Sequence, residues 1–593
     1  MKKWMLLMVF AVGVMEIGWG QVDSAAIKEV DSLLQVSRTL TGQRNYDKAL
    51  EVIAIAEKLA LEKLGRESVA YGKCCNSLGT MYANKGNHLE AEKWFLESKA
   101  IREKVLGKEH PDYAMTMNNL ANVFVAMGKF EKAEPLYLEV IVIQAKVLGK
   151  EHRNYAWTLN NLAGLYLKMG EFASAESLYY EAKAIQEKVL GKEHPDYAQS
   201  LNNLAILYRN MGNYEKAEPL YLEANAIREK ALGKEHPDYA QSLNNLAGLY
   251  RKMGKYEKAE PLYLQAKAIR EKALGREHPY YAASLNNLAN LYRDMGHYEK
   301  SELLHLEAKP IYEKALGKEH PDYAESLNNL ASLYGEIGNY EKAEPLFLEA
   351  EAIRQKVLGK QHPDYATNLN DLAILYGEIG NYEKAELLYR ELSKLNQSLI
   401  TKAVHHLSER ELNNYLHTFS EAQAQTLSLA QITTANKSDI SQTCYDNTLF
   451  YKGFLLNALN KIKYLAQSDA ASTEKFNLLK SCERRLVREY TKPIAERDSV
   501  SVVNLETQSN ELQKDLARSV AGYAEAVRQV RWQDVQKALK PDEVAVEFVH
   551  YRYHGKIPTD STFYAALLLR SGWEQPHFVL LFEEKELFKY SSC

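Results

Sequence analysis

Histidine recurs at a fixed spacing in this 593-residue chain, and its side chain can bind a metal or carry a proton. Seven histidines stand 42 residues apart, at His110, His152, His194, His236, His278, His320 and His362. If the repeating units stack, equivalent positions lie on the order of 10 Å apart. The ligands of a zinc ion lie only about 2.0–2.1 Å from the metal. We therefore expect no metal and no other cofactor, and we interpret each histidine as a residue that begins a helix.

Adjacent asparagines recur at the same spacing and offer a different chemistry. The first of each pair is Asn76, Asn118, Asn160, Asn202, Asn244, Asn286, Asn328 and Asn370. The second is asparagine at 119, 161, 203, 245, 287 and 329, with Ser77 and Asp371 in the end repeats. Asparagine is a mediocre helix former, but its amide both donates and accepts, which suits gripping a peptide backbone. Two interpretations stay open: the amides bind a partner, or they bond to the neighbouring repeat and hold the stack in register.

Charged residues further along the same face predict the polarity of such a groove. Arg209, Arg251 and Arg293 give three consecutive repeats a basic position, whereas the last two repeats carry Glu336 and Glu378 in that stretch. We expect a protein or peptide partner to place an acidic segment across the fourth to sixth repeats. The chain as a whole has 74 basic and 78 acidic residues, so it lacks the basic excess of a nucleic-acid-binding protein.

Each 42-residue unit carries the pattern of two helices. In residues 194–235, Pro195 suits a first helical position, and Gly212 and Gly233 suit helix ends because glycine tolerates the left-handed conformation. Sixteen of the 30 glycines fall on these two stop positions. The apolar stripe of the first helix, with spacing i, i+3, i+4, i+7, consists of Leu201, Leu204, Ala205 and Tyr208.

Small residues mark where helices should cross closely. In the first helix they are Ala121, Ala163, Ala205, Ala247, Ala289, Ala331 and Ala373. In the second helix they are Ala133, Ala175, Ala217, Ala259, Ala343 and Ala385, with Ser301 as the one departure. We interpret the tyrosine stripe that follows as core packing and not as a ligand cage: Tyr166, Tyr208, Tyr250, Tyr292, Tyr334 and Tyr376.

The strings Leu-Asn-Asn-Leu-Ala, Glu-Lys-Ala-Glu-Pro-Leu-Tyr and Leu-Gly-Lys-Glu-His-Pro resemble the 42-residue tetratricopeptide repeats of kinesin light chains and their bacterial relatives. The resemblance implies an all-α fold, a right-handed superhelical tetratricopeptide solenoid whose first helices line a concave groove for extended peptides. Family members bind peptides with asparagines of the first helix. It therefore implies groove residues at Asn118, Asn160, Asn202, Asn244, Asn286, Asn328 and Asn370, to which the charge pattern adds Arg209, Arg251 and Arg293.

The first 20 residues read as an export signal. Lys2 and Lys3 precede an apolar run, and small residues stand before Gln21. The run is shorter than the ~20 residues that span a membrane. We expect an exported protein, periplasmic or extracellular, with no integral span after cleavage; an uncleaved N-terminal anchor is the alternative.

The end of the chain has a different pattern. Residues 544–549, 563–569 and 578–582 predict strands. The strings Trp532-Gln533-Asp534-Val535, Val546-Glu547-Phe548 and Tyr564-Ala565-Ala566 resemble the start of a CHAT domain. That resemblance implies a caspase-like fold with a His–Cys dyad. The dyad is absent here, because His554-Gly555 precedes the second strand and Cys593 is the last residue, so we expect no catalysis.

We divide the chain into a signal peptide at 1–20, a degenerate capping repeat at 21–67 and eight repeats at 68–403. A helical linker follows at 404–540, with a coiled-coil pattern at 505–530, and then the truncated start of a CHAT-like α/β domain at 541–593. Cys444 and Cys482 either pair across two helices or stay free. The sequence favours a binding scaffold. The alternatives are the N-terminal part of a CHAT-type peptidase and a purely structural spacer.

Overall fold

The computed structural model describes residues 23–42, 45–403, 418–433, 439–465, 470–490, 530–554 and 561–587, with isolated residues between 412 and 416 and between 502 and 516. The chain divides into two compact units. One consists of Met1–Leu165, Ser174–Leu333 and Glu349–His362, and the other of Tyr166–Ala173, Tyr334–Leu348 and Pro363–Cys593. Among the described helices, none has the length and apolar character that crossing a bilayer requires.

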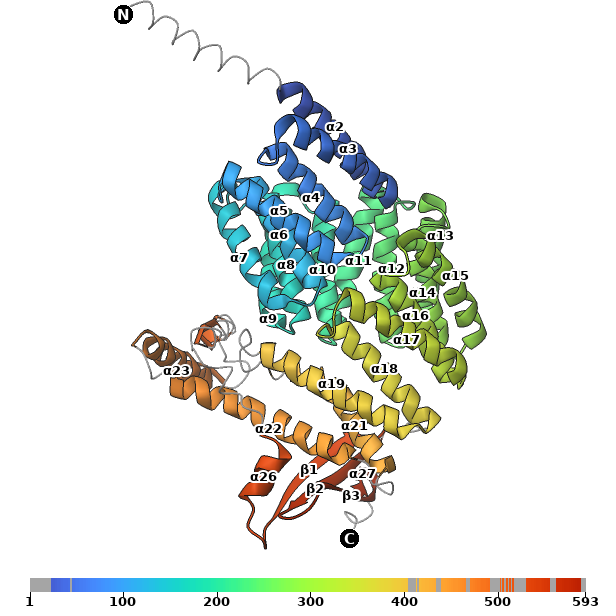
Figure 1. Ribbon diagram of the computed structural model, residues 1–593, viewed down its shortest axis with the longest axis vertical. Coiled ribbons are helices and arrows are strands. Elements are labelled where there is room, and N and C mark those ends of the chain that lie inside the picture. Colours follow the sequence, from blue (N-terminus) through green and yellow to red (C-terminus); the bar gives the residue numbers. More distant parts are fainter. Residues whose placement is uncertain are drawn as a thin grey trace, which may run out of the picture. The chain divides into compact units, whose positions relative to one another are not determined.

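Helix pairs follow one another along the repeats (Figure 1). A first pair is α2 (Asp23–Gly42) and α3 (Tyr46–Leu64). The repeats then give α4 (Val69–Asn84), α5 (His88–Leu106), α6 (Pro111–Ala126), α7 (Phe130–Val147), α8 (Arg153–Lys168), α9 (Phe172–Leu190), α10 (Pro195–Asn210), α11 (Tyr214–Leu232), α12 (Pro237–Lys252), α13 (Tyr256–Leu274), α14 (Pro279–Asp294), α15 (Tyr298–Leu316), α16 (Pro321–Ile337), α17 (Tyr340–Val357), α18 (Pro363–Ile379) and α19 (Tyr382–Ala403). From α10 to α15 each helix packs on the next, as expected of an all-α solenoid.

Local chemistry sets the helix ends. In six of the repeated histidines, Nδ1 accepts a hydrogen bond at 3.0–3.1 Å from the backbone N–H two residues later. This confirms that the histidines begin helices, as side-chain caps for otherwise unpaired N–H groups. The sixteen stop-position glycines all have positive φ, for example 71° at Gly212 and 85° at Gly233. A residue with a Cβ would be strained there.

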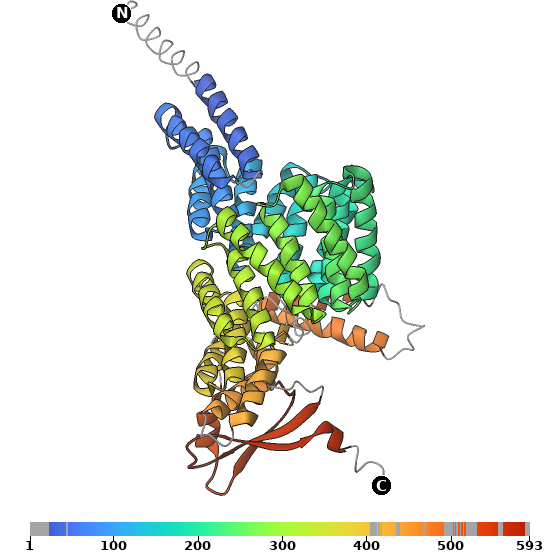
Figure 2. The ribbon, with the colours of Figure 1, turned by 90° about the vertical axis from the view of Figure 1, so that its right-hand side faces the viewer.

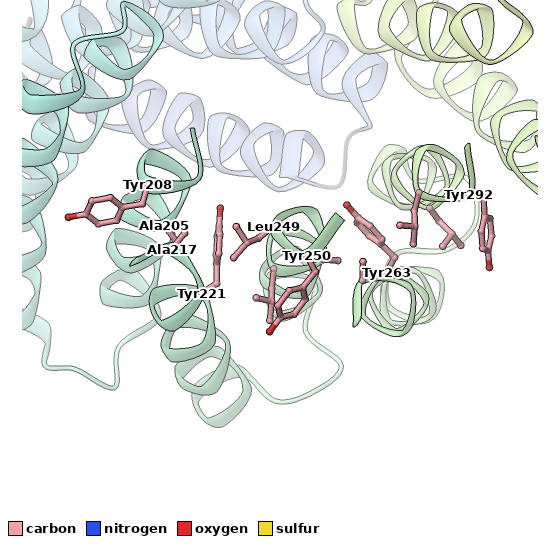
Figure 3. Packing of buried hydrophobic residues seen from close by; sticks show 13 residues of the cluster. Ala205, Tyr208, Ala217, Tyr221, Leu249, Tyr250, Tyr263 and Tyr292 are labelled. Atoms are coloured by element: carbon pink, nitrogen blue, oxygen red, sulfur yellow. The ribbon is translucent and has the colours of Figure 1, made fainter. Parts of the chain in front are cut away.

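Small and aromatic residues form the core between layers, as the sequence predicted. The alanines at the crossing points are fully buried, and so is Ser301. The predicted tyrosine stripe is buried as well. Figure 3 shows the cluster around Tyr208, Tyr250 and Tyr292, in which Ala205 and Ala217 leave room for the rings.

The core tyrosines also tie each repeat to the one before it. Tyr250 Oη donates to Glu218 at 2.7 Å, and Tyr292 Oη donates to Glu260 at 2.7 Å. Burial and the bond to Glu218 raise the pKa of Tyr250 to about 12. The stripe therefore combines apolar packing with a directional bond between layers.

The second unit contains the C-terminal helices and a sheet. The helices are α21 (Ser420–Thr433), α22 (Ile440–Leu465), α23 (Ala470–Tyr490), α26 (Trp532–Ala538) and α27 (Glu584–Leu587). The strands β1 (Val544–Arg552), β2 (Thr562–Arg570) and β3 (His577–Glu583) lie side by side in one antiparallel sheet of order β1-β2-β3 (Figure 2). Phe548 pairs with Ala566, and a bulge lies at Tyr564/Ala565. The three predicted strands are confirmed.

Several sequence predictions fall where the structure gives no description. The signal peptide at 1–20, most of the coiled-coil pattern at 505–530, Gly555 and the final Ser-Ser-Cys lie outside the described residues. Cys444 and Cys482 are buried free thiols, and Cys444 Sγ donates to the Thr426 carbonyl at 3.7 Å. The disulfide alternative is therefore not formed in this structure.

Candidate functional site

The paired asparagines form a ladder of amide–amide hydrogen bonds between repeats. In the second to fifth repeats, the Nδ2 of the second asparagine donates to the Oδ1 of the first asparagine in the preceding repeat. The bonds are Asn119 to Asn76 at 3.3 Å, Asn161 to Asn118 at 3.1 Å, Asn203 to Asn160 at 3.3 Å and Asn245 to Asn202 at 2.7 Å. The register interpretation therefore holds for these amides. Since an amide has two N–H donors and two acceptor lone pairs, the bonds leave capacity for a ligand.

Burial separates the two sets of asparagines. The first asparagines are half-buried at 118, 160 and 370 but buried at Asn202, Asn244, Asn286 and Asn328. The second asparagines are half-buried in every repeat from 119 to 329. The second set thus offers more of its amide to a partner than the first set, on which the sequence had placed the groove. Ligand contact by the first set stays a prediction.

Among the described residues the ladder does not continue past Asn202, since Asn286 Oδ1 bonds to His305 Nδ1 at 2.9 Å and Asn328 Oδ1 accepts from Arg354 Nη1 at 3.2 Å instead. Asn244 Oδ1, the acceptor that Asn287 would reach by the same pattern, is buried without a hydrogen-bond partner among the described residues. Asn244 itself is 8% exposed. A buried acceptor without a partner costs free energy of about 1–3 kcal/mol. Asn244 Oδ1, like Asn370 Oδ1 in the last repeat, is therefore an acceptor that a ligand donor would satisfy.

Asn244 lies in a hollow of ≈ 560 Å³ on the first unit. Its lining comes from five consecutive helices: Arg209 and Asn210 of α10, Tyr214 of α11, Asn244, Asn245, Gly248, Arg251 and Lys252 of α12, Tyr263 of α13 and Asn287 of α14, with Gly212 between α10 and α11. The structure thus brings together Asn244, Arg209 and Arg251 of the predicted set. The lining does not include Arg293 or the other predicted asparagines.

Gly248 keeps the floor of this hollow open. A Cβ at that position would lie 3.4 Å from Tyr263 Oη and 3.6 Å from Arg209 Nη1. Figure 3 shows the Tyr263 hydroxyl pointing to the opposite side of the cluster from the Tyr250 hydroxyl. Burial raises the pKa of Tyr263, so its side chain is a neutral hydroxyl that can donate.

The three predicted arginines have different electrostatic roles. Arg251 is paired with Asp294 of the next repeat, with Nε to Oδ2 at 2.7 Å and Nη2 to Oδ1 at 3.3 Å. Arg293 Nη2 lies 3.8 Å from the same carboxylate. Arg209 occupies the equivalent position one repeat earlier, but Lys252 stands where Asp294 would be. Within the described part of the chain Arg209 and Lys252 have no carboxylate partner, so the uncompensated positive charge of the hollow lies there.

Comparison with known proteins identifies the architecture. The profile of the family described as tetratricopeptide repeat matches residues 74–144, 126–188, 154–230, 196–272, 238–314, 304–356 and 322–398. These ranges together cover more than half of the chain. The stack of helix pairs is therefore a repeat solenoid, and the chain belongs to the tetratricopeptide-repeat family. The comparison with curated proteins gives no match.

Parts of this chain are similar to solved structures of other proteins. A Podosopora anserina protein described as a kinesin light chain with nearly identical repeats is 32% identical, over 35% of this chain and 98% of its own, with a TM-score of 0.30. BtubC from P. vanneervenii is 26% identical over 39% of this chain and 91% of its own, with a TM-score of 0.32. A Rap protein complexed with Competence and Sporulation Factor is 16% identical over 56% of this chain and 99% of its own, with a TM-score of 0.40.

Proposed function

We propose that this chain is a non-catalytic scaffold that binds an extended segment of a partner protein, held at the hollow over the fourth to sixth repeats. The single observation that carries the proposal is the end of the amide ladder inside the hollow, where Asn244 Oδ1 has no partner among the described residues. Repeat solenoids of this family commonly use their extended surfaces for binding other chains.

The chemistry of the hollow suits a peptide backbone. Asn244 Oδ1 accepts from a backbone N–H of the bound segment, and the second N–H of Asn245 donates to a backbone carbonyl. Because both groups are amides, they do not read the side chains of the partner. A neighbouring contact must therefore supply the specificity.

Charge supplies that specificity. Arg209 and Lys252 attract an acidic side chain of the partner, whereas Arg251 is already compensated by Asp294. We therefore expect the acidic segment of the partner to lie beside Arg209 and Lys252, and not across all three repeats as the sequence predicted. Hydrogen bonds to charged groups are worth roughly 1.5–3 kcal/mol.

The test uses the tightest-binding dodecapeptide selected on the wild-type chain from a random display library. Its affinity is measured by fluorescence anisotropy for the wild type, for the double variant R209A/K252A and for K230A. Lys230 is a matched control, since it is exposed and pairs with Glu193 outside the hollow. We expect R209A/K252A to weaken binding at least about tenfold, more so at low salt, and K230A to leave it unchanged. Equal affinities for all three proteins would overturn the proposal.

We further propose that the scaffold works outside the cytoplasm, on the pattern of residues 1–20 alone. Cell fractionation followed by N-terminal sequencing of the recovered protein tests this. A mature chain that begins at Gln21 in the envelope or medium supports export. A cytoplasmic chain that still begins at Met1 contradicts it.

A second candidate function is favoured by the C-terminal sheet. Val546 and Phe548 on β1 are 41% and 66% exposed, which is unusual for large apolar side chains of one sheet face. Such a face fits the start of a caspase-like CHAT domain whose remaining half comes from elsewhere. Reading the DNA downstream of codon 593 in all frames tests this. A following His-Gly and Ser-Ala-Cys string would favour the peptidase, and its absence would leave the scaffold alone.

A further inference from the structure

Three buried arginines of the first unit, Arg102, Arg228 and Arg270, have no carboxylate partner among the described residues, and two of them lie beside the hollow. Arg228 on α11 is 5% exposed and Arg270 on α13 is 1% exposed. Arg270 Nη1 donates to Ser284 Oγ at 2.9 Å and to the Tyr280 carbonyl at 3.1 Å, and Arg228 Nη1 donates to Ser242 Oγ at 2.6 Å. Burying a charge is costly, so neutral acceptors around it need a reason beyond packing.

The Nη2 atom of each guanidinium begins a chain of hydrogen bonds that reaches the asparagine ladder. Arg270 Nη2 donates to Gln241 Oε1 at 2.6 Å, and Gln241 Nε2 donates to Asn245 Oδ1 at 2.9 Å. Asn245 Nδ2 then donates to Asn202. The preceding repeat has the same chain of bonds through Arg228, Gln199 and Asn203, with distances of 2.5 and 2.8 Å.

The direction of these bonds is fixed by chemistry. Arginine can only donate, so the oxygen of Gln241 must face it, and the NH₂ of Gln241 must then face Asn245. Asn245, which lines the hollow, therefore turns its oxygen toward Gln241 and its NH₂ toward Asn202. One N–H of that NH₂ goes to Asn202, and the other remains for a ligand. The buried charge also polarises the chain of bonds in the direction that strengthens this donor.

Only two repeats carry both parts of this arrangement. The first repeat has Arg102 with Lys73 in the glutamine position, and the seventh has Arg354 with Glu325. The second and third repeats replace the arginine by glutamine, at Gln144 and Gln186. The arginine–glutamine–asparagine relay is thus confined to the fourth and fifth repeats, whose first helices, α10 and α12, supply most of the hollow.

We propose that Arg228 and Arg270 are positioning residues for partner binding. Through Gln199 and Gln241 they fix the amides of Asn203 and Asn245 as hydrogen-bond donors. This part of the repeat array consequently selects acceptor oxygens, the backbone carbonyls and carboxylates of the bound segment. The inference rests on the proposed function, because it concerns the same hollow.

The decisive variant is Gln241→Glu. The new carboxylate pairs with Arg270 and can only accept, so it takes a hydrogen bond from Asn245 Nδ2 and turns the Asn245 oxygen toward the ligand. The buried arginine gains a counter-ion, so the fold is kept while the donor is lost. The ion pair with Arg270 offsets the loss of the Asn245–Asn202 hydrogen bond, so we expect little change in stability together with about tenfold weaker binding of the selected dodecapeptide. A merely structural role predicts that affinity follows stability instead.

The matched control is Arg102→Gln. Arg102 is 1% exposed and donates to the Asp112 carbonyl at 2.5 Å and to Thr116 at 2.7 Å, but Lys73 in place of a glutamine gives it no relay. We expect R102Q to lower stability and leave affinity unchanged. Gln241→Ala serves as a second test variant, because it removes the relay without adding a charge; we expect about threefold weaker binding as the Asn245 amide becomes free to turn.

The outcomes separate the two proposals. Loss of affinity in R209A/K252A with no loss in either Q241E or Q241A overturns the relay and keeps the proposed function. Full affinity in R209A/K252A overturns the proposed function, and the relay with it. Loss of affinity in R102Q equal to that in Q241E shows a general effect of buried polar changes and also overturns the relay.

Discussion

Two substitutions of Gly248 test the stability of α12 and the shape of the hollow separately. Glycine in a helix interior is about 1 kcal/mol less favourable than alanine. An added Cβ would meet only Tyr263 Oη at 3.4 Å and Arg209 Nη1 at 3.6 Å, which are ordinary van der Waals distances. Gly248→Ala should therefore stabilise α12 by about 1 kcal/mol, the full helix-propensity difference. Gly164→Ala, in the same slot of the third repeat and 3.6 Å from Tyr179 Oη, should give the same gain.

Hydrogen exchange measures this gain locally, which suits a repeat array whose global unfolding need not be two-state. We expect α12 amides to exchange about fivefold more slowly in G248A, and α8 amides likewise in G164A. Binding then distinguishes the two sites. Isoleucine occupies the equivalent position in two other repeats, at Ile206 and Ile374, so the Gly248→Ile variant should fold. Its side chain should occupy the hollow and weaken binding of the dodecapeptide, whereas Gly164→Ile should leave that binding unchanged. Faster exchange of α12 in G248A, or equal affinity of both isoleucine variants, would refute the reasoning.

Three further predictions concern single positions. Ser301→Ala should stabilise α15 by about 1–2 kcal/mol in thermal unfolding, because Ser301 Oγ is buried with no hydrogen-bond partner among the described residues; a lower midpoint would contradict this. Burial and the nearby Arg293 charge lower the pKa of His305 to about 3. As the pH falls below about 6.5, the unfolded chain therefore binds a proton that the folded chain does not. The free energy of unfolding should then fall by about 1 kcal/mol per pH unit toward pH 4. His305→Tyr should remove that part of the slope in urea titrations across pH, and an unchanged slope would sink the assignment. Asp294→Asn should release Arg251 from its ion pair and strengthen the acidic dodecapeptide about fivefold; weaker binding in anisotropy would count against the charge account.

Much of the fold could be predicted from the repeat itself. The 42-residue period gives the stacked helix pairs, the glycines give the helix ends, and the alanines and tyrosines give the core. These features depend on local conformation and side-chain size, and the residues that determine them recur in each repeat. The three C-terminal strands were also readable, since apolar runs such as 563–569 are bounded by turns.

The candidate site could be predicted only in part. The sequence pointed to Asn244, Arg209 and Arg251, which the hollow brings together. It did not show that Asp294 neutralises Arg251, although both this pair and the amide ladder share a separation of 43 residues that an analysis of repeat positions would reveal. It also missed Gln241 and Arg270, whose signal is that glutamine and arginine occur together in two repeats alone.

The hollow itself has no such signal. It exists because Gly248 lacks a side chain at a point where α10, α12 and α13 converge, and the angle of that convergence depends on packing between layers. Similarly, the burial of Asn202 against the greater exposure of Asn203 depends on which side of the helix faces the neighbouring layers, which the composition of the repeat does not fix.

Site-specific photo-crosslinking tests the central claim, that a partner segment occupies this hollow, most directly. Benzoylphenylalanine replaces Asn210, which is exposed and lines the hollow, or Ala226, which is exposed on α11 outside it. The selected dodecapeptide should crosslink to the chain carrying the probe at 210 and not to the chain carrying it at 226. Crosslinking at 226 alone, or equal yield at both positions, would contradict the account.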